Sequence, residues 1–198
     1  MKDQRINESL QTWNKIAESF HHTRKHPWKL CSDYISSLSN TSICADLGCG
    51  NGRHLIPLSK QCAQSIGFDI SNNLLSIVSE QLKKNKIHNC SLVQGDLCRL
   101  PFTNSSIDHI LYIAALHNIR NKENRIQSLQ EVGRILKSGG TALITVWNKK
   151  QDRFKNKSFS KNKYTEDGDT LVYWRQHKLN IARFYHLYDL EEFTQELA

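Results

Sequence analysis

The chain has 198 residues, of which 38% are hydrophobic, and this size fits one domain with a full core. The first residues form no apolar signal region, and no stretch approaches the roughly 20 apolar residues of a membrane span, so we expect a cytoplasmic or nuclear protein without a membrane partner. The formal net charge of +8 indicates either an anionic partner, most simply nucleic acid, or merely a basic surface.

Six cysteines are spread along the chain without any C-x-x-C pair. Several of them fall in or beside predicted strands, which favours buried free thiols over disulfides or a zinc site. We therefore expect no metal site.

Hydrophobic spacing predicts the elements in chain order. Apolar residues at steps of three and four predict a helix over 4–21, and a second helix follows over 29–38. Strands are then expected at 42–47, 64–69, 90–95, 107–113 and 140–147, with helices at 52–60, 72–85 and 122–136 between them. A short strand at 170–177 and a final helix at 189–197 end the chain. This alternation predicts an α/β fold with a doubly wound, mostly parallel sheet.

Three glycines at alternate positions follow the first predicted strand, in Asp46-Leu-Gly-Cys-Gly-Asn-Gly-Arg53. Gly48, Gly50 and Gly52 allow a sharp turn and a close approach to a ligand, although such glycines alone could form an ordinary tight turn. A dinucleotide fingerprint needs glycine at position 53, where this chain has Arg53. Asp46 would repel a pyrophosphate but suits the cationic ammonium group of an amino-acid ligand such as S-adenosylmethionine.

Two further carboxylates follow the next two predicted strands. Asp69 lies 19 residues after Gly50, the spacing at which a second strand presents an acid to ribose hydroxyls. Asp96 ends the third strand, where it could accept a hydrogen bond from an adenine amino group. Their neighbours Ile70 and Leu97 complete the predicted cofactor site. The alternative role for such strand-end acids is helix capping.

Taken together, the glycine loop and the two acids resemble those of class I S-adenosylmethionine-dependent methyltransferases. The stretch 129–140 is similar to the family's helix and turn before the fifth strand, with Ser138 where proline is common. The resemblance implies a Rossmann-like fold and S-adenosylmethionine as the cofactor. The family usually adds two more strands at the end, whereas this sequence stops at Ala198, so we expect the C-terminal edge strands to be missing and the fifth strand to lack a partner.

The segments outside this core resemble one branch of the family. Residues 13–28 look like the N-terminal signature of the tRNA wobble-uridine methyltransferases that esterify 5-carboxymethyluridine, with Trp13 in place of tyrosine. Residues 182–188 are similar to that family's Arg-Tyr-Tyr-His-Leu-Tyr, with Phe184 in place of the first tyrosine. Residues 113–117 resemble its fourth-strand motif, in which a histidine faces the methyl donor. The resemblance implies a tRNA anticodon loop as substrate and a small zinc-binding activator protein that pairs with a sheet edge.

Ester formation on a carboxylate makes modest chemical demands. The carboxylate is ionised at neutral pH, so the enzyme needs no general base, only in-line placement in a dry pocket. Guanidinium groups suit the acceptor carboxylate or a phosphate, and aromatic rings suit a splayed base. We expect the catalytic residues to be His117, Arg24, Arg183 and His186, and the substrate-binding residues to be Trp28, Tyr185 and Arg183.

The organisation that follows is one domain with four parts. Residues 1–40 form an N-terminal helical cap, 41–147 the cofactor-binding core, 148–188 a basic insertion with the acceptor segment, and 189–198 the C-terminal helix. Lys149 to Lys163 carries seven cations and one acid, which indicates either phosphate contacts or compositional drift. Two other functions stay open: a small-molecule methyltransferase that uses His117 as a general base, and a non-catalytic methyltransferase-like subunit.

Overall fold

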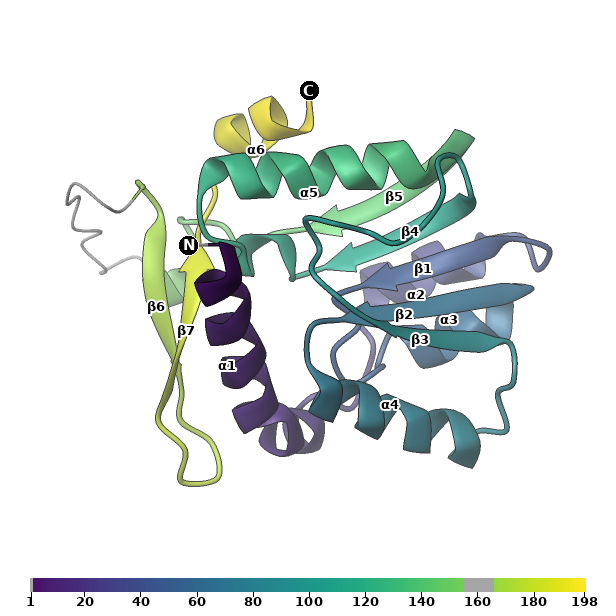
Figure 1. Ribbon diagram of the computed structural model, residues 1–198, viewed down its shortest axis with the longest axis horizontal. Helices are drawn as coiled ribbons and strands as arrows, with labels where there is room; N and C mark the ends of the chain where they lie inside the picture. The colour runs from purple at the N-terminus through teal and green to yellow at the C-terminus, as the bar shows by residue number, and fades with distance from the viewer. Residues whose placement is uncertain (1, 155–165) are drawn as a thin grey trace.

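The computed structural model describes residues 2–154 and 166–198, and at its centre lies a five-stranded sheet (Figure 1). All pairings in this sheet are parallel, and its spatial order is β3-β2-β1-β4-β5. The strands are β1 (Ile43–Leu47), β2 (Gln64–Asp69), β3 (Cys90–Gln94), β4 (Ile107–Ile113) and β5 (Leu136–Thr145). The strand order reverses between β1 and β4, where a doubly wound sheet opens a crevice at its carboxyl edge.

Each face of the sheet carries its own apolar core, because successive strand residues point to opposite faces. From β1, Ala45 and Leu47 join a cluster with Val132 of α5 (Lys122–Ile135). Cys44 joins the other cluster, built with α2 (Lys29–Ser36), α3 (Leu55–Gln61) and α4 (Asn72–Lys84). Figure 1 shows α5 along one side of the sheet and α4 along the other. The predicted doubly wound α/β fold is confirmed.

Several boundaries differ from those that the sequence predicts, and two of them lie next to glycines with positive φ. Helix α3 begins at Leu55 rather than near Gly52, because the three loop glycines all have positive φ and prolong the turn. Strand β5 begins at Leu136, where the sequence predicts helix and turn. Gly139 has a φ of 77°, and the pairing with β4 shifts register between Ile107 and His109.

A separate two-stranded antiparallel sheet consists of β6 (Asp169–Trp174) and β7 (Ile181–His186). The sequence predicts a strand near β6 but none at β7, so β7 is a strand that the prediction missed. Within residues 2–154 and 166–198, β5 pairs only with β4. Just beyond it, Asn148 makes a single parallel bridge to Tyr188. The expected lack of added edge strands in the main sheet therefore fits the described part of the chain.

Helix α1 (Lys2–Thr23) connects the two sheets (Figure 1). At the start of α4, the Ser71 hydroxyl donates to Asn14 Oδ1 at 2.6 Å. Further along α1, Ser19 Oγ accepts from the indole Nε1 of Trp174 in β6 at 2.8 Å. One helix thus contacts both the core and the β6–β7 hairpin.

Three short elements complete the chain. They are α6 (Leu190–Leu197), capped by the Asp189 side chain, and the 3-10 turns η1 (Leu116–Asn118) and η2 (Asp152–Phe154). In the portion that the structure describes, none of the helices combines the length and apolarity needed to cross a membrane.

Candidate cofactor and acceptor site

A cavity of about 720 Å³ lies at the carboxyl edge of the main sheet, and α1, the strand-end loops and the β6–β7 hairpin all contribute to its walls. Its lining includes eleven predicted site residues: Asp46, Gly48, Gly50, Asp69, Ile70, Asp96, Leu97, Arg24, Trp28, Arg183 and Tyr185. Three predicted residues, Gly52, His117 and His186, do not line it. The structure thus brings most of the predicted cofactor and acceptor residues onto one cavity.

The glycine loop forms one wall of the cavity, and its backbone packs so closely that a side chain at Gly48 would not fit. The backbone N–H groups of Gly48 and Cys49 both donate to the Phe68 carbonyl, at 2.7 and 3.0 Å. A Cβ at Gly48 would lie 2.5 Å from the Cβ of Ala115, closer than real Cβ atoms approach. Gly52 instead faces Val78 of α4, so its lack of a side chain serves packing.

Asp46 and His54 present buried polar atoms to one end of the cavity. Asp46 is 2% exposed and its Oδ2 has no hydrogen-bond partner among the described residues. Burial, together with the nearby Asp69, raises the pKa of Asp46 to about 7, although Arg53 lowers it. His54 is equally buried, both its ring nitrogens lack such partners, and burial lowers its pKa to about 3. These atoms fit the amino-acid end of S-adenosylmethionine, whose ammonium would complement Asp46.

Asp69 is fixed by two backbone groups. Its Oδ2 accepts from the Gly50 N–H at 2.8 Å and its Oδ1 from the Ser71 N–H at 2.9 Å. Burial raises the pKa of this carboxyl, while those N–H groups lower it. A carboxylate oxygen has two lone pairs, so each can still accept one ribose hydroxyl. The capping of α4 comes from Ser71, whose Oγ accepts from the Leu74 N–H.

Asp96 pairs with Arg5, a residue that the sequence analysis did not predict to belong to the site. Arg5 of α1 forms an ion pair with its Oδ2 at 2.5 Å, and its Oδ1 accepts from the Cys98 N–H at 3.2 Å. Both oxygens keep one lone pair for an adenine amino group. Arg5 itself lines the cavity.

On the hairpin side, Arg183 supplies a buried cation. It is 5% exposed, donates to Tyr185 Oη at 2.7 Å, and its guanidinium carbon lies 5.0 Å from the ring centroids of Trp174 and Tyr185. The aromatic wall excludes water around the guanidinium and strengthens its attraction for an anion. This arrangement suits a carboxylate or a phosphate.

Arg24 and Trp28 lie between the glycine-loop side and the hairpin side of the cavity. The Arg24 guanidinium carbon is 5.4 Å from the Trp174 ring, on the hairpin side, and the Arg24 carbonyl accepts from Asn51 Nδ2 at 2.7 Å, on the glycine-loop side. Trp28 lies under Arg53, 4.9 Å from its guanidinium carbon, and is 38% exposed. Trp28 therefore borders the cofactor end of the cavity.

His117 lies in the cavity wall rather than on its surface. The ring is fully buried, and its centroid is 4.7 Å from that of Tyr185 and 5.7 Å from that of Trp147. Burial, with additional contributions from Arg183 and His186, lowers its pKa to about 3. Its neutral imidazole contacts the acceptor side through Tyr185.

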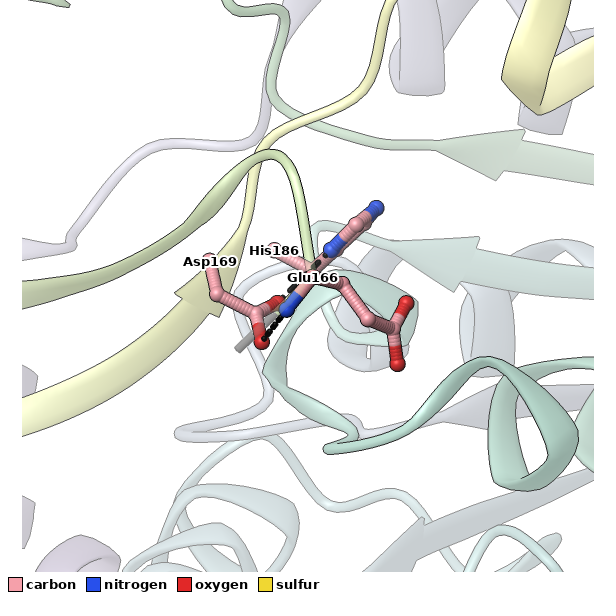
Figure 2. Close-up of side chains that lie close together, drawn as sticks. All are labelled: Glu166, Asp169 and His186. Atoms are coloured by element: carbon pink, nitrogen blue, oxygen red, sulfur yellow. Dashed lines mark hydrogen bonds and ion pairs between the residues drawn. The ribbon is translucent and has the colours of Figure 1, made fainter. Parts of the chain in front are cut away.

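His186 lies in a group of charged residues outside the cavity (Figure 2). Its Nδ1 is 2.8 Å from Asp169 Oδ1, the contact drawn in Figure 2, and its Nε2 is 2.9 Å from Glu192 Oε1. Glu166, Asp169 and His186 have potential metal-ligand atoms within 4.8 Å of one another. However, Glu166 already accepts from Arg125 at 2.7 Å. We assign His186 to this ion-pair network, and its position gives no support to the predicted catalytic role.

Lys149, the first cation of the predicted basic insertion, belongs to the same charged region. Its ammonium lies 3.3 Å from Asp167, 3.5 Å from Asp189 and 3.3 Å from Glu192. Three carboxylates therefore compete with any phosphate for this lysine. Residues 155–163 of the insertion lie outside the described residues.

The lining residues that the sequence prediction missed include Arg5, Arg53, His54 and Arg120. Arg53 and His54 directly follow the glycine loop, and that adjacency was a usable signal. Arg5 and Arg120 reach the cavity from distant segments, and no local pattern marks them.

Comparison with known proteins identifies the family. Residues 45–144 match a family model described as a methyltransferase domain. The tRNA (carboxymethyluridine(34)-5-O)-methyltransferase of Schizosaccharomyces pombe is 32% identical, over 93% of this chain and 84% of that protein. The chain belongs to this methyltransferase family. The family membership expected from the motifs is thereby confirmed.

Other members are longer than this chain. The Xenopus tropicalis tRNA (carboxymethyluridine(34)-5-O)-methyltransferase alkbh8 is 37% identical over 81% of this chain but only 23% of its own length. The chain thus spans about a quarter of the length of such relatives.

Solved structures show the same fold at low identity. An S-adenosylmethionine-dependent methyltransferase from Clostridium acetobutylicum has a TM-score of 0.74 at 19% identity, covering 93% of this chain and 85% of that one. A complex of the Haloferax volcanii Trm112 methyltransferase activator with a methyltransferase gives a TM-score of 0.70 at 19% identity, covering 97% of this chain and 74% of the other.

Proposed function

We propose that the protein transfers a methyl group from S-adenosylmethionine to the carboxylate of 5-carboxymethyluridine at the tRNA wobble position, forming the methyl ester. One observation carries the proposal. A single cavity joins the glycine loop and its strand-end acids to the buried Arg183, in a chain whose fission-yeast relative is named for this reaction.

The positions of the residues support the following roles. When bound, S-adenosylmethionine would supply an electrophilic methyl group. Asp46 and His54 would hold the amino-acid end, Asp69 the ribose hydroxyls, and Asp96 the adenine amino group. Arg183 would hold the acceptor carboxylate in line, in a wall of rings that excludes water.

His117 fits the role of a positioning residue. It packs against Tyr185, which lines the acceptor side of the cavity, and its low pKa keeps the imidazole neutral. A carboxylate acceptor needs no base, so a histidine that does not titrate near neutrality is compatible with this reaction.

The partners are a tRNA anticodon loop and a small zinc-binding activator protein. The net charge of +8 supports an RNA partner. Support for the activator comes from the Haloferax volcanii complex and from the two outer strands of the main sheet, β3 and β5, each paired on one side only among the described residues. A cytoplasmic location, or a nuclear one, stays a prediction.

The two alternative functions make different demands. A small-molecule methyltransferase acting on a hydroxyl or amine would need a base, and a pKa near 3 does not suit His117 for that role. A non-catalytic subunit would have no use for a buried Arg183 that lines the same cavity as the proposed cofactor residues. The named relatives also favour the tRNA reaction.

The decisive experiment is nucleoside mass spectrometry of tRNA that carries unesterified 5-carboxymethyluridine, after incubation with the protein and methyl-labelled cofactor. Label should appear in the methyl ester and be released as methanol by mild alkali, which does not cleave base or ribose methyl groups. Arg183→Ala should abolish most of this product, whereas Arg99→Ala, an exposed arginine outside the cavity, should not. Alkali-stable label on the RNA, or label only on small molecules, would contradict the proposal.

A further inference from the structure

The β6–β7 hairpin has a face to whose residues the proposed function assigns no role. Directly opposed residues of an antiparallel pair lie on the same face. The register opposes Leu171 to Phe184 and Tyr173 to Ala182, so these four residues lie on one face, and we call the surface that they form the outer face. The opposed pair Asp169 and His186 lies on the same face, at the end of β6 where the strand begins. Arg183 belongs to the opposite face, where it is opposed to Val172.

The outer face leaves large apolar side chains open to solvent. Leu171 is 43% exposed and Tyr173 is 42% exposed, whereas Val172 and Trp174, which alternate with them along β6, are almost fully buried. An exposed apolar surface of this kind on a folded domain commonly marks a binding site.

Two arginines accompany the aromatic rings of this face. The Arg120 guanidinium carbon lies 4.3 Å from the centroid of Phe184, and that of Arg175 lies 5.4 Å from the centroid of Tyr173. From Thr170 to His186 the sequence holds three Lys or Arg residues, of which Arg183 lies on the opposite face. The acidic residue at the start of β6, Asp169, is already paired with His186 at 2.8 Å. The face therefore combines stacking surfaces with positive charge.

The outer face is continuous with the cavity. Leu171, Ala182, Phe184 and Arg120 all line the cavity, and Tyr173 lies one same-face position further along β6. Same-face positions on a strand are about 7 Å apart, which leaves room for successive unstacked bases. A strand of RNA whose reacting base enters the cavity would thus pass over these rings.

We propose that the outer face is a stacking platform for the single-stranded bases next to the base that is methylated. This inference rests on the proposed function and extends it to residues outside the reacting site. Single-stranded RNA fits better than a protein partner, because bases stack on aromatic rings and on guanidinium planes while phosphates pair with the arginine charge. A duplex would not stack in this way, since its bases are already paired.

Binding of two RNA hairpins separates stacking from charge. One is the anticodon hairpin, and the other carries abasic residues at the loop positions beside the wobble base, with the same number of phosphates. Wild-type protein should prefer the first. Tyr173→Ala should weaken binding to it about fivefold or more, the loss of one base–aromatic stack, with the salt dependence unchanged. Tyr173→Phe should retain affinity, and so should Leu190→Ala, which removes a 75% exposed residue of α6.

Arg175 gives an independent check. Arg175→Gln should reduce the slope of log affinity against log salt by about one unit, the loss of one phosphate contact. Arg175→Lys should keep that slope while losing part of the preference for bases over abasic residues.

The proposal is overturned if Tyr173→Ala binds the anticodon hairpin as wild type does, or if it weakens both hairpins equally. It is also overturned if wild type sediments as a dimer and Tyr173→Ala as a monomer of unchanged RNA affinity, because the face would then contact a second copy. Methyl-ester formation is read separately: Tyr173→Ala should reach the wild-type rate at saturating hairpin. Absence of ester with wild type would sink the proposed function without affecting the binding comparison.

Discussion

Arg5 in the first helix and Asp96 at the end of the third strand, 91 residues apart in sequence, form an ion pair at the rim of the cavity. Both side chains are about 15% exposed. The pair links α1 to the carboxylate that we expect to recognise adenine, so the position of the helix and the geometry of the cofactor site depend on each other.

A double-mutant cycle measures this link. Arg5→Gln, Asp96→Asn and the double variant should show a coupling of about 1 kcal/mol in the free energy of unfolding, since a partly buried charged hydrogen bond is lost. Urea denaturation of the four proteins provides the values. A coupling indistinguishable from zero would mean that Arg5 does not hold Asp96 in solution.

Cofactor affinity should depend on pH through Asp46. Its pKa of about 7 means that the carboxyl is largely protonated below neutrality, whereas the cationic ligand favours the ionised form. Affinity should therefore rise about tenfold per pH unit below 7, flatten above it, and be accompanied by proton release. Calorimetry from pH 5.5 to 8.5, in buffers of different ionisation enthalpy, measures both effects.

Asp46→Asn is the matched control for that titration, because it keeps the shape and removes the charge. Its affinity should be weak and independent of pH. A sloping profile that survives in Asp46→Asn would assign the titration to another group.

The rate of methyl transfer should not titrate with His117. A pKa near 3 leaves this imidazole neutral between pH 6 and 8, so kcat should be flat over that range. His117→Asn, which keeps a hydrogen-bond donor and most of the contact with Tyr185, should retain much more activity than His117→Ala. Two equally inactive variants, with a wild-type rate that rises with an apparent pKa near 7, would instead identify His117 as a base.

Arg125 should be essential for stability. It is fully buried and donates to Glu196, also buried, at 3.0 Å. Arg125→Ala leaves that carboxylate without its cation and should lower the free energy of unfolding by about 3 to 5 kcal/mol. Lys29→Ala, which breaks an exposed pair with Asp33, should leave the urea midpoint nearly unchanged. Recovery in the double variant Arg125→Leu/Glu196→Leu would show that the unpaired charge is the cause, and a loss under 1 kcal/mol for Arg125→Ala would contradict this account.

The core of the fold could be predicted because its signals are local. The apolar spacing of each helix or strand, and the glycine loop, each involve residues that are close together in the sequence. Asp46, Asp69 and Asp96 then reach the same edge of the sheet because its strands are parallel. Strand β7 was missed because its sequence mixes charged, aromatic and aliphatic residues whose alternation becomes visible only beside β6.

Two features of the site that the sequence did not reveal share another cause. His186 belongs to a sequence motif, but its contacts with Asp169 and Glu192 depend on the packing of segments that the sequence alone does not bring together. Arg5 reaches Asp96 across 91 positions for the same reason. A motif identifies the residue type, and the tertiary contacts decide whether that residue faces the ligand.

The reactivity of the cysteine thiols can be used to measure local opening of the domain. Five of the six cysteines are buried. Burial raises the pKa of Cys31 to about 11 and that of Cys98 to about 12, so these two side chains meet a reagent only as un-ionised thiols enclosed by the packed core. Cys90, on the outermost strand β3, is the partly exposed exception. A maleimide added to the native protein would thus modify Cys90 quickly and the buried cysteines only as fast as the domain opens locally. The order in which the buried cysteines react would show which part of the core opens first.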